Sequence, residues 1–305
     1  MPELEDQSVS LVVTSPPYWQ LKDYGEEKQI GFHQTYEEYI NDLNLVWKEC
    51  YRVLQDGCRM CINIGDQFAR AKYYGRYKVI PIRTEIIKFC EIMGFDYMGA
   101  IIWQKATTMN TSGGASLMGS YPHPRNGMIT LDYEFILLFK KPGDAPMPSK
   151  EIKESSAMTK EEWRKWFVGH WNFAGARQKE HLAAFPEELP YRLIKMFSFV
   201  HETVLDPFMG SGTTAAVAQK TKRKSIGYEI NNQFIPIIQK RVSGDLAENS
   251  TAGVVVTKRK STHYDRKGLL ASLPYRFKDT KKIDKKVDPR EITFGSKINM
   301  QKTGT

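Results

Sequence analysis

The segment Ser15-Pro16-Pro17-Tyr18 contains groups that could act on an amino group attached to an aromatic ring. The lone pair of such a nitrogen is delocalised into the ring, so the nitrogen must be drawn toward tetrahedral geometry before it attacks. The hydroxyl of Ser15 and the carbonyl of Pro16 can accept hydrogen bonds from its two hydrogens. The prolines fix the backbone, and Tyr18 offers a face on which a flat ring can stack. The segment therefore has the groups that methylation of an aromatic amine requires.

A second segment, D-P-F-M-G-S-G-T-T over residues 206–214, lies between an expected strand and an expected helix. Glycines at such a turn let the backbone approach a ligand closely. The lysine of a phosphate-binding loop is absent, and Asp206 would repel a pyrophosphate but could pair with an ammonium group. Glu229, at the end of the next expected strand, could accept the hydroxyls of a ribose. The pattern indicates a site for an adenosine-type sulfonium ligand. A tight turn with a helix cap at Thr213 or Thr214 is the alternative.

Apolar patterns predict strands and helices that alternate along the chain and position these two segments. We expect strands over residues 9–14, 59–64, 95–103, 132–139, 203–206 and 225–229, and helices over residues 35–54, 81–93, 186–199 and 213–220. Thr35 and Glu38 form a capping-box pattern at the start of the first helix, and Gly57 is expected to end it. The fold class is therefore α/β.

The motif T-S-P-P-Y-W, followed much later by D-P-F-M-G-S-G-T-T, resembles the bacterial amino-group DNA methyltransferases of restriction–modification systems. The order of the two motifs resembles the circularly permuted β class, and the similarity covers about residues 6–242. The resemblance implies a doubly wound, Rossmann-like methyltransferase sheet with S-adenosylmethionine as cofactor. It implies double-stranded DNA as the substrate. A cognate restriction endonuclease and a second copy of the chain, in a homodimer, are the partners that the resemblance allows.

The resemblance also implies residue roles. Ser15, Pro16, Pro17 and Tyr18 would act on a base that has left the duplex stack. The cofactor-binding candidates are Thr14, His181, Phe185, Pro186, Asp206, Pro207, Phe208, Gly210, Ser211, Gly212, Thr213, Thr214 and Glu229. Among them His181 begins a segment that resembles the family's H-x-A-x-F-P motif, which helps to enclose the cofactor. A surface or capping histidine is the alternative.

Four regions follow from the motifs and from breaks in composition. Residues 1–141 would be the catalytic half of the methyltransferase domain, 142–180 an inserted target-recognition region, 181–242 the cofactor-binding half and 243–305 a basic C-terminal extension. The glycine-rich loop 106–130 is too long for a simple connection and is expected to contact DNA. The DNA-binding candidates are Trp19, Asn110, His123, Arg125 and Asn126. The last four are of types that read base edges, although each could be an ordinary solvated side chain.

Charge and cysteine content narrow the protein class. The net charge is +9, and residues 243–305 contribute +7 of it, so this extension could contact phosphates or be a disordered tail. Four cysteines, including the pair Cys58 and Cys61, are too few for a disulfide framework and have no second ligand pair for zinc. We expect no metal site. With no signal peptide or membrane-spanning run in the sequence, we expect a cytoplasmic protein.

Two points stay open at the level of sequence. Family members usually begin with a further strand ending in Gly-Asp, which this chain lacks, so either the sheet is one strand short or residues 253–257 replace that strand. Serine at position 15 favours cytosine N4 over adenine N6 as the methylated atom, although some adenine enzymes also have serine. A non-catalytic DNA-binding subunit is an alternative of another class. An RNA or protein glutamine methyltransferase is disfavoured by the early position of the catalytic motif.

Overall fold

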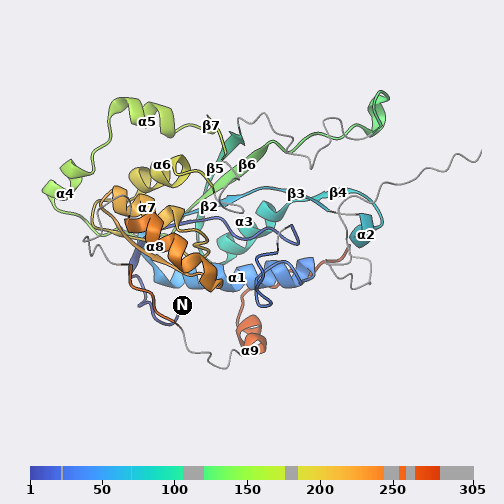
Figure 1. Cartoon of the computed structure of the whole chain (residues 1–305), viewed down its shortest axis with the longest axis horizontal. Coiled ribbons are helices and arrows are strands. Elements are labelled where there is room, and N and C mark those ends of the chain that lie inside the picture. Colours follow the sequence, from blue (N-terminus) through green and yellow to red (C-terminus); the bar gives the residue numbers. More distant parts are fainter. Residues whose placement is uncertain are drawn as a thin grey trace, which may run out of the picture.

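The computed structural model describes residues 1–21, 23–69, 71–105, 120–175, 185–243, 254–258 and 265–281. These residues form a seven-stranded sheet in the order β7-β5-β6-β2-β1-β8-β9 (Figure 1). The strands are β1 (Val9–Thr14), β2 (Leu54–Ile64), β5 (Asp96–Lys105), β6 (Tyr133–Lys140), β7 (His170–Phe173), β8 (Thr203–Asp206) and β9 (Lys224–Gly227). A separate two-stranded ribbon pairs β3 (Gln67–Ala69) with β4 (Lys78–Ile80).

Most of the sheet is parallel. Strand β1 pairs in parallel with β2 and β8, and β8 pairs in parallel with β9. Strand β6 is antiparallel to both of its neighbours, β2 and β5, whereas β5 and β7 are parallel. The loops that follow β1, β2, β8 and β9 therefore emerge at one edge of the sheet, where open α/β sheets place their ligand sites.

Helices cover both faces of the sheet, as the doubly wound class requires. Val12 of β1 faces a core that includes α1 (Tyr36–Val53) and α3 (Ile82–Ile92), while Leu11 and Val13 face a second core that includes α6 (Glu188–Phe197) and α7 (Thr213–Lys220). Figure 1 shows α1 and α6 on opposite sides of the strands. The remaining helices are α2 (Ala71–Tyr74), α4 (Lys150–Ser155), α5 (Lys160–Trp166), α8 (Ile235–Ser243) and α9 (Arg266–Ala271), with 3₁₀ turns at Pro124–Asn126 and Asn232–Phe234.

The predicted strand 9–14, strand 203–206 and helix 213–220 are confirmed residue for residue. The capping box is also confirmed, because the Thr35 side chain accepts from the Glu38 amide and the Glu38 carboxylate accepts from the Thr35 amide. The prediction that Gly57 ends this helix is wrong. The helix ends at Val53, and Gly57 lies within β2 at φ +74°, where a Cβ would meet the Ala145 backbone nitrogen at 2.3 Å. Gly57 is thus required by close packing and its positive φ.

At its β9 edge the sheet ends among the described residues, and residues 254–258, which could have replaced the strand that family members carry, form no strand. The replacement of that strand by residues 253–257 is therefore not supported by the part of this segment that the structure describes. The region 142–180, predicted as an inserted recognition region, contributes β7 to the main sheet and buries Trp166 and Trp171 in the α6-side core. Residues 166–173 are therefore part of the same sheet and core as the motif loops.

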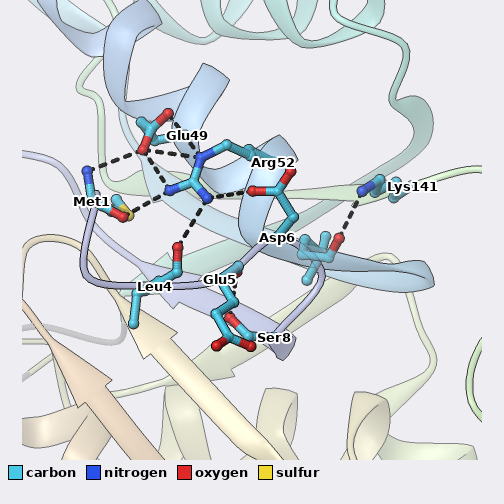
Figure 2. A network of polar contacts seen from close by, with 9 residues as sticks. Met1, Leu4, Glu5, Asp6, Ser8, Glu49, Arg52 and Lys141 are labelled. Atoms are coloured by element: carbon cyan, nitrogen blue, oxygen red, sulfur yellow. Dashed lines mark hydrogen bonds and ion pairs between the residues drawn. The ribbon is translucent and has the colours of Figure 1, made fainter.

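The N-terminal segment is held to α1 before it enters β1 (Figure 2). The Arg52 guanidinium donates to the Leu4 and Met1 carbonyls at 2.9 and 2.7 Å, to Asp6 at 2.6 Å and to Glu49 at 2.9 Å. The Met1 amino group donates to the same Glu49 carboxylate at 3.0 Å. These contacts fix residues 1–6 over the last turns of α1, so β1 enters the sheet from an anchored segment.

Candidate active site

The two motif loops, almost 200 residues apart in the chain, emerge side by side. Strands β1 and β8 are hydrogen-bonded neighbours, with Leu11 opposite Val204 and Val12 opposite Leu205. Their last residues, Thr14 and Asp206, are joined directly, because the Thr14 hydroxyl donates to Asp206 Oδ1 at 2.7 Å. One hydrogen bond therefore links the residue before Ser15 to the first residue of the glycine-rich loop.

Asp206 is the buried centre of this junction and is 1% exposed. Besides Thr14, it accepts hydrogen bonds from the Thr214 hydroxyl at 2.7 Å and from the Phe208 amide at 3.0 Å. Burial raises the pKa of the Asp206 carboxyl, and these three donors oppose that rise. Pairing of this carboxylate with a ligand ammonium stays a prediction. In this structure Asp206 ties the two loops to the start of α7.

The glycine-rich loop leaves free space above its backbone. Gly210 has φ +52°, and a Cβ built on it would meet no atom within 4 Å, so a ligand can approach the chain here. Glu229 Oε2 accepts the Gly210 amide at 2.8 Å, and Oε1 accepts the Asn231 amide at 2.7 Å. Burial raises the pKa of Glu229. Each carboxylate oxygen keeps a further acceptor position, so ribose binding by Glu229 stays a prediction.

The side chains of the loop are mostly engaged with the protein. Ser211 and Thr213 are buried, and both hydroxyls accept from Arg241 of α8, at 2.9 and 2.5 Å. Phe208 points toward α1, with its ring 6.1 Å from that of Trp47. Pro207 is buried and Gly212 packs on Ile238 of α8. Contacts with α1, α7 and α8 thus hold the loop in place. Arg241 is a contributor that sequence reasoning missed, because nothing in its helix pattern marks it.

In the S-P-P-Y loop, the groups predicted to hold an amine are free to do so. Within the described residues, neither the Ser15 hydroxyl nor the Pro16 carbonyl has a hydrogen-bond partner, and Ser15 is half-buried. The next carbonyl along, that of Pro17, accepts from the Tyr39 hydroxyl of α1 at 2.8 Å. The loop is therefore fixed through its neighbouring groups and leaves its first two acceptors available.

Tyr18 is held by the loop that follows β2. Its hydroxyl accepts from the Gly65 amide at 2.9 Å. Burial raises the pKa of Tyr18 well above 10, and the nearby Glu134 carboxylate adds to the rise. Glu134 in turn accepts from Asn63 at 2.7 Å and pairs with Lys105. These residues end β2 and β5 and begin β6. The sequence predicts a strand over residues 59–64, but the pairing between β2 and β6 was not predictable from spacing.

The DNA-binding candidates divide into three groups. Trp19 is 3% exposed, because its ring packs against Tyr36 and Tyr73 and its indole nitrogen donates to the Gln34 carbonyl. This burial does not support its contact with DNA, which stays a prediction. His123, Arg125 and Asn126 are exposed on and beside the 3₁₀ turn between β5 and β6. Asn110 lies outside the described residues.

The cofactor-binding candidates before α6 lie in the segment that precedes the glycine-rich loop. His181 lies outside the described residues. Phe185 and Pro186 are half-buried just before α6, where Phe185 packs on the α6-side core.

The four cysteines are free thiols that lie in β2, α1 and α3. Cys58 and Cys61 both lie in β2 and are free, and burial raises their pKa to about 11 and about 12. Among the residues that the structure describes, no three histidine, cysteine or acidic side chains gather as metal ligands would. No helix in the described ranges is both long and apolar enough to cross a membrane.

Comparison with known proteins gives this geometry its family. The sequence matches the N6/N4 methyltransferase family model, described as DNA methylase, over residues 9–240. The chain belongs to this family. The match includes both loops and every strand of the main sheet, so the methylase domain extends from the start of β1 into α8.

Individual members of the family are similar over most of their length. The type II methyltransferase M.MjaI of Methanocaldococcus jannaschii is 38% identical over 271 residues, covering 79% of this chain and 88% of its own. M.MthZI of Methanothermobacter thermautotrophicus is 34% identical, covering 92% and 84%. A putative DNA modification methylase of Thermus thermophilus, solved in complex with S-adenosyl-L-methionine, superposes with a TM-score of 0.64 at 32% identity, covering 79% and 88%. The chain is a type II DNA methyltransferase of the N4/N6 amino-methyltransferase family.

Proposed function

We propose that this methyltransferase transfers a methyl group from S-adenosylmethionine to the N4 amino group of a cytosine that has been flipped out of double-stranded DNA. The observation that carries the proposal is the hydrogen bond between Thr14 and Asp206, which holds two free acceptors for an amine next to an open glycine-rich loop. Serine at position 15 favours cytosine over adenine within the family.

The residues around the glycine-rich loop fit S-adenosylmethionine. The open space over Gly210 accommodates a ligand against the backbone, and the Glu229 oxygens retain acceptor capacity toward ribose hydroxyls. We assign Phe208, Gly210, Gly212 and Glu229 to the cofactor. The bound sulfonium supplies an electrophilic methyl group. Asp206, Ser211, Thr213 and Thr214 support this loop through their hydrogen bonds to Thr14, to Arg241 and to one another.

The loop after β1 has the work of orienting the amine. The Ser15 hydroxyl and the Pro16 carbonyl accept its two hydrogens, which directs the nitrogen lone pair toward the neighbouring cofactor loop. Pro16 and Pro17 keep this arrangement rigid, so little reorganisation is needed when the base arrives. Tyr18, fixed by Gly65, presents its ring to the base. Because the acceptor loop precedes the cofactor loop in the chain, we assign the enzyme to the permuted β class.

The proposed function also has consequences for DNA recognition and for partners. We propose that His123, Arg125 and Asn126, exposed between β5 and β6, contribute to recognition of the DNA site. A cognate restriction endonuclease and a homodimer stay predictions of the family resemblance. The role of residues 142–180 in target recognition likewise stays a prediction.

The experiment that tests the function identifies the methylated nucleoside. The purified enzyme is incubated with unmethylated plasmid DNA and S-adenosylmethionine, and the DNA is digested to nucleosides and analysed by mass spectrometry. We expect N4-methyl-2′-deoxycytidine, which should form about 100-fold more slowly with Ser15→Ala under the same conditions. Detection of N6-methyladenine would overturn the choice of base, but the assignment as an amino-methyltransferase would still hold. DNA without any methylation, in the presence of cofactor binding or without it, would overturn the reaction itself and favour a DNA-binding subunit.

A further inference from the structure

Part of the basic C-terminal extension packs on the methylase domain in a defined register. Residues 265–281, which we call the strap, comprise α9 and an extended segment that follows it along α1 (Figure 1). Arg266 pairs with Asp42 of α1 at 2.9 Å, and Lys48 donates to the Ser272 hydroxyl at 2.9 Å. The strap lies beyond residue 240, where the family match ends, and its partners on α1 lie within the match.

The extended part of the strap alternates between half-buried and exposed residues. Tyr275, Phe277 and Asp279 face the domain, while Arg276 and Lys278 point to solvent. This period of two is that of a strand with one covered face. A run of this kind is not a solvated tail, so part of the strap's sequence is specified by the surface beneath it.

Asn41 fixes the register of the strap. Its side chain is 4% exposed, and its amide donates to the Phe277 carbonyl while its oxygen accepts from the Phe277 amide, both at 2.9 Å. A single side chain thereby replaces the pairing that a neighbouring strand would give. Because both hydrogen bonds involve one residue of the strap, a shift by one residue would break both and leave the buried Asn41 amide with only its bond to the Glu37 carbonyl.

From this point two lines of contacts lead to the S-P-P-Y loop. The Phe277 ring lies 5.2 Å from that of Tyr36, which lies 5.4 Å from that of Trp19. Asp279 accepts from the Tyr74 hydroxyl of α2 at 2.9 Å, and the preceding residue of α2, Tyr73, packs its ring 5.0 Å from Trp19. The strap therefore holds both elements that enclose Trp19, the first turn of α1 and helix α2.

Trp19 in turn fixes the end of the loop that bears Ser15 and Pro16. Its carbonyl accepts from Gln67 of β3 at 2.6 Å, and its indole donates to the Gln34 carbonyl at 2.8 Å. We propose that the strap is a positioning element of the active site, in which Phe277 and Asp279 act through Tyr36, Tyr74 and Trp19 to hold the amine-accepting loop in place. This inference rests on the proposed function, since the loop that it positions is the proposed catalytic one.

The test compares Phe277→Ala with a matched control on the same face of the strap. Tyr275→Ala also removes an aromatic ring, but Tyr275 contacts Lys88 of α3, away from Trp19. Phe277→Tyr serves as the conservative variant. Single-turnover methyl transfer, cofactor affinity by calorimetry and hydrogen–deuterium exchange of peptides spanning residues 14–21 are measured for each purified full-length protein.

We expect Phe277→Ala to slow methyl transfer about 10-fold, less than the ~100-fold that a displacement of 1 Å can cost, and to speed amide exchange in residues 14–21. Cofactor affinity should stay within about twofold, since Gly210 and Glu229 lie in the loops after β8 and β9, and Phe277→Tyr should restore the rate. Equal effects from Tyr275→Ala, or unchanged exchange in Phe277→Ala, would overturn the coupling. A wild-type protein that leaves DNA unmethylated would overturn the proposed function and the catalytic meaning of the strap, while the exchange data would still report the coupling.

Discussion

Removal of the hydroxyl of Thr14 should weaken the junction between the two loops in a manner that depends on pH. Thr14→Val keeps the β-branched shape but deletes the 2.7 Å hydrogen bond to Asp206, which is 1% exposed. Hydrogen bonds to charged groups contribute about 1.5–3 kcal/mol, so we expect a loss of that size in the free energy of unfolding at pH 7. For a domain of this size the corresponding fall in Tm is on the order of 5 °C.

The pH dependence follows from the Asp206 carboxyl. Burial raises its pKa in the folded protein above 3.8, its ordinary value, so the folded state binds this proton more tightly than the unfolded state does. Its contribution to the free energy of unfolding therefore falls as pH rises from 3.8 through the folded pKa, and is smallest above it. Loss of a donor raises the folded pKa further. The destabilisation by Thr14→Val should thus be largest at neutral pH and shrink as pH falls toward 3.8.

Thr214→Val provides the matched control, because Thr214 donates to the other oxygen of the same carboxylate at the same 2.7 Å. Urea unfolding of both variants and of the double variant, at pH 7 and at the lowest pH where the wild type stays folded, measures these energies. We expect similar single losses and a non-additive double, since both donors share one partner. Thr14→Val should in addition slow methyl transfer. Destabilisation by Thr14→Val under about 0.5 kcal/mol, or identical at both pH values, would refute the reasoning.

Three further predictions concern the surroundings of the site. Glu229→Gln turns an amide NH₂ toward the Gly210 or Asn231 amide and should weaken cofactor binding about 10-fold by calorimetry. Glu202→Gln also removes a carboxylate that accepts a backbone amide, but at the far end of β8, and should leave cofactor binding unchanged; equal losses in the two variants would contradict the prediction. Arg125→Ala should lower DNA affinity about 5- to 100-fold in a binding titration, with Lys224→Ala near wild type, and unchanged affinity would remove Arg125 from the interface. Arg52→Ala should lower the free energy of unfolding by about 1–3 kcal/mol through the freed N-terminal segment, without changing cofactor affinity, and an unchanged Tm would argue against that anchor.

The sequence predicted the elements whose ends are set by local chemistry. Val9–Thr14 ends because prolines follow it, and α1 begins at its capping box, so both boundaries were visible in the residues alone. The position of the two motif loops at one sheet edge was also predictable, since both follow β-type strands in an α/β chain. These local signals suffice for the family and for the outline of the site.

Long-range contacts account for what the sequence did not reveal. Gly57 carried a helix-stop signal, yet its conformation is dictated by Ala145, which is distant in the chain. Asp206 has the residue type of an ammonium ligand, but its hydrogen bond to Thr14, 192 residues away, was not visible in the sequence. Trp19 is of a type that stacks on bases, and burial by Tyr36 and Tyr73 removes it from the surface. In each case the deciding partner comes from another part of the fold.

The division of labour between the two loops is tested most directly by Ser15→Ala, with single-turnover methyl transfer and cofactor affinity measured on the same preparation. Loss of one hydrogen-bonding group at a reacting centre typically costs about 100-fold in rate. We predict a fall of about that size in the rate of methyl transfer, with cofactor affinity within about twofold of the wild type, because the cofactor loop is untouched. A rate that stays at the wild-type level, or a loss of cofactor affinity equal to the loss of rate, would contradict the assignment of Ser15 to the amine.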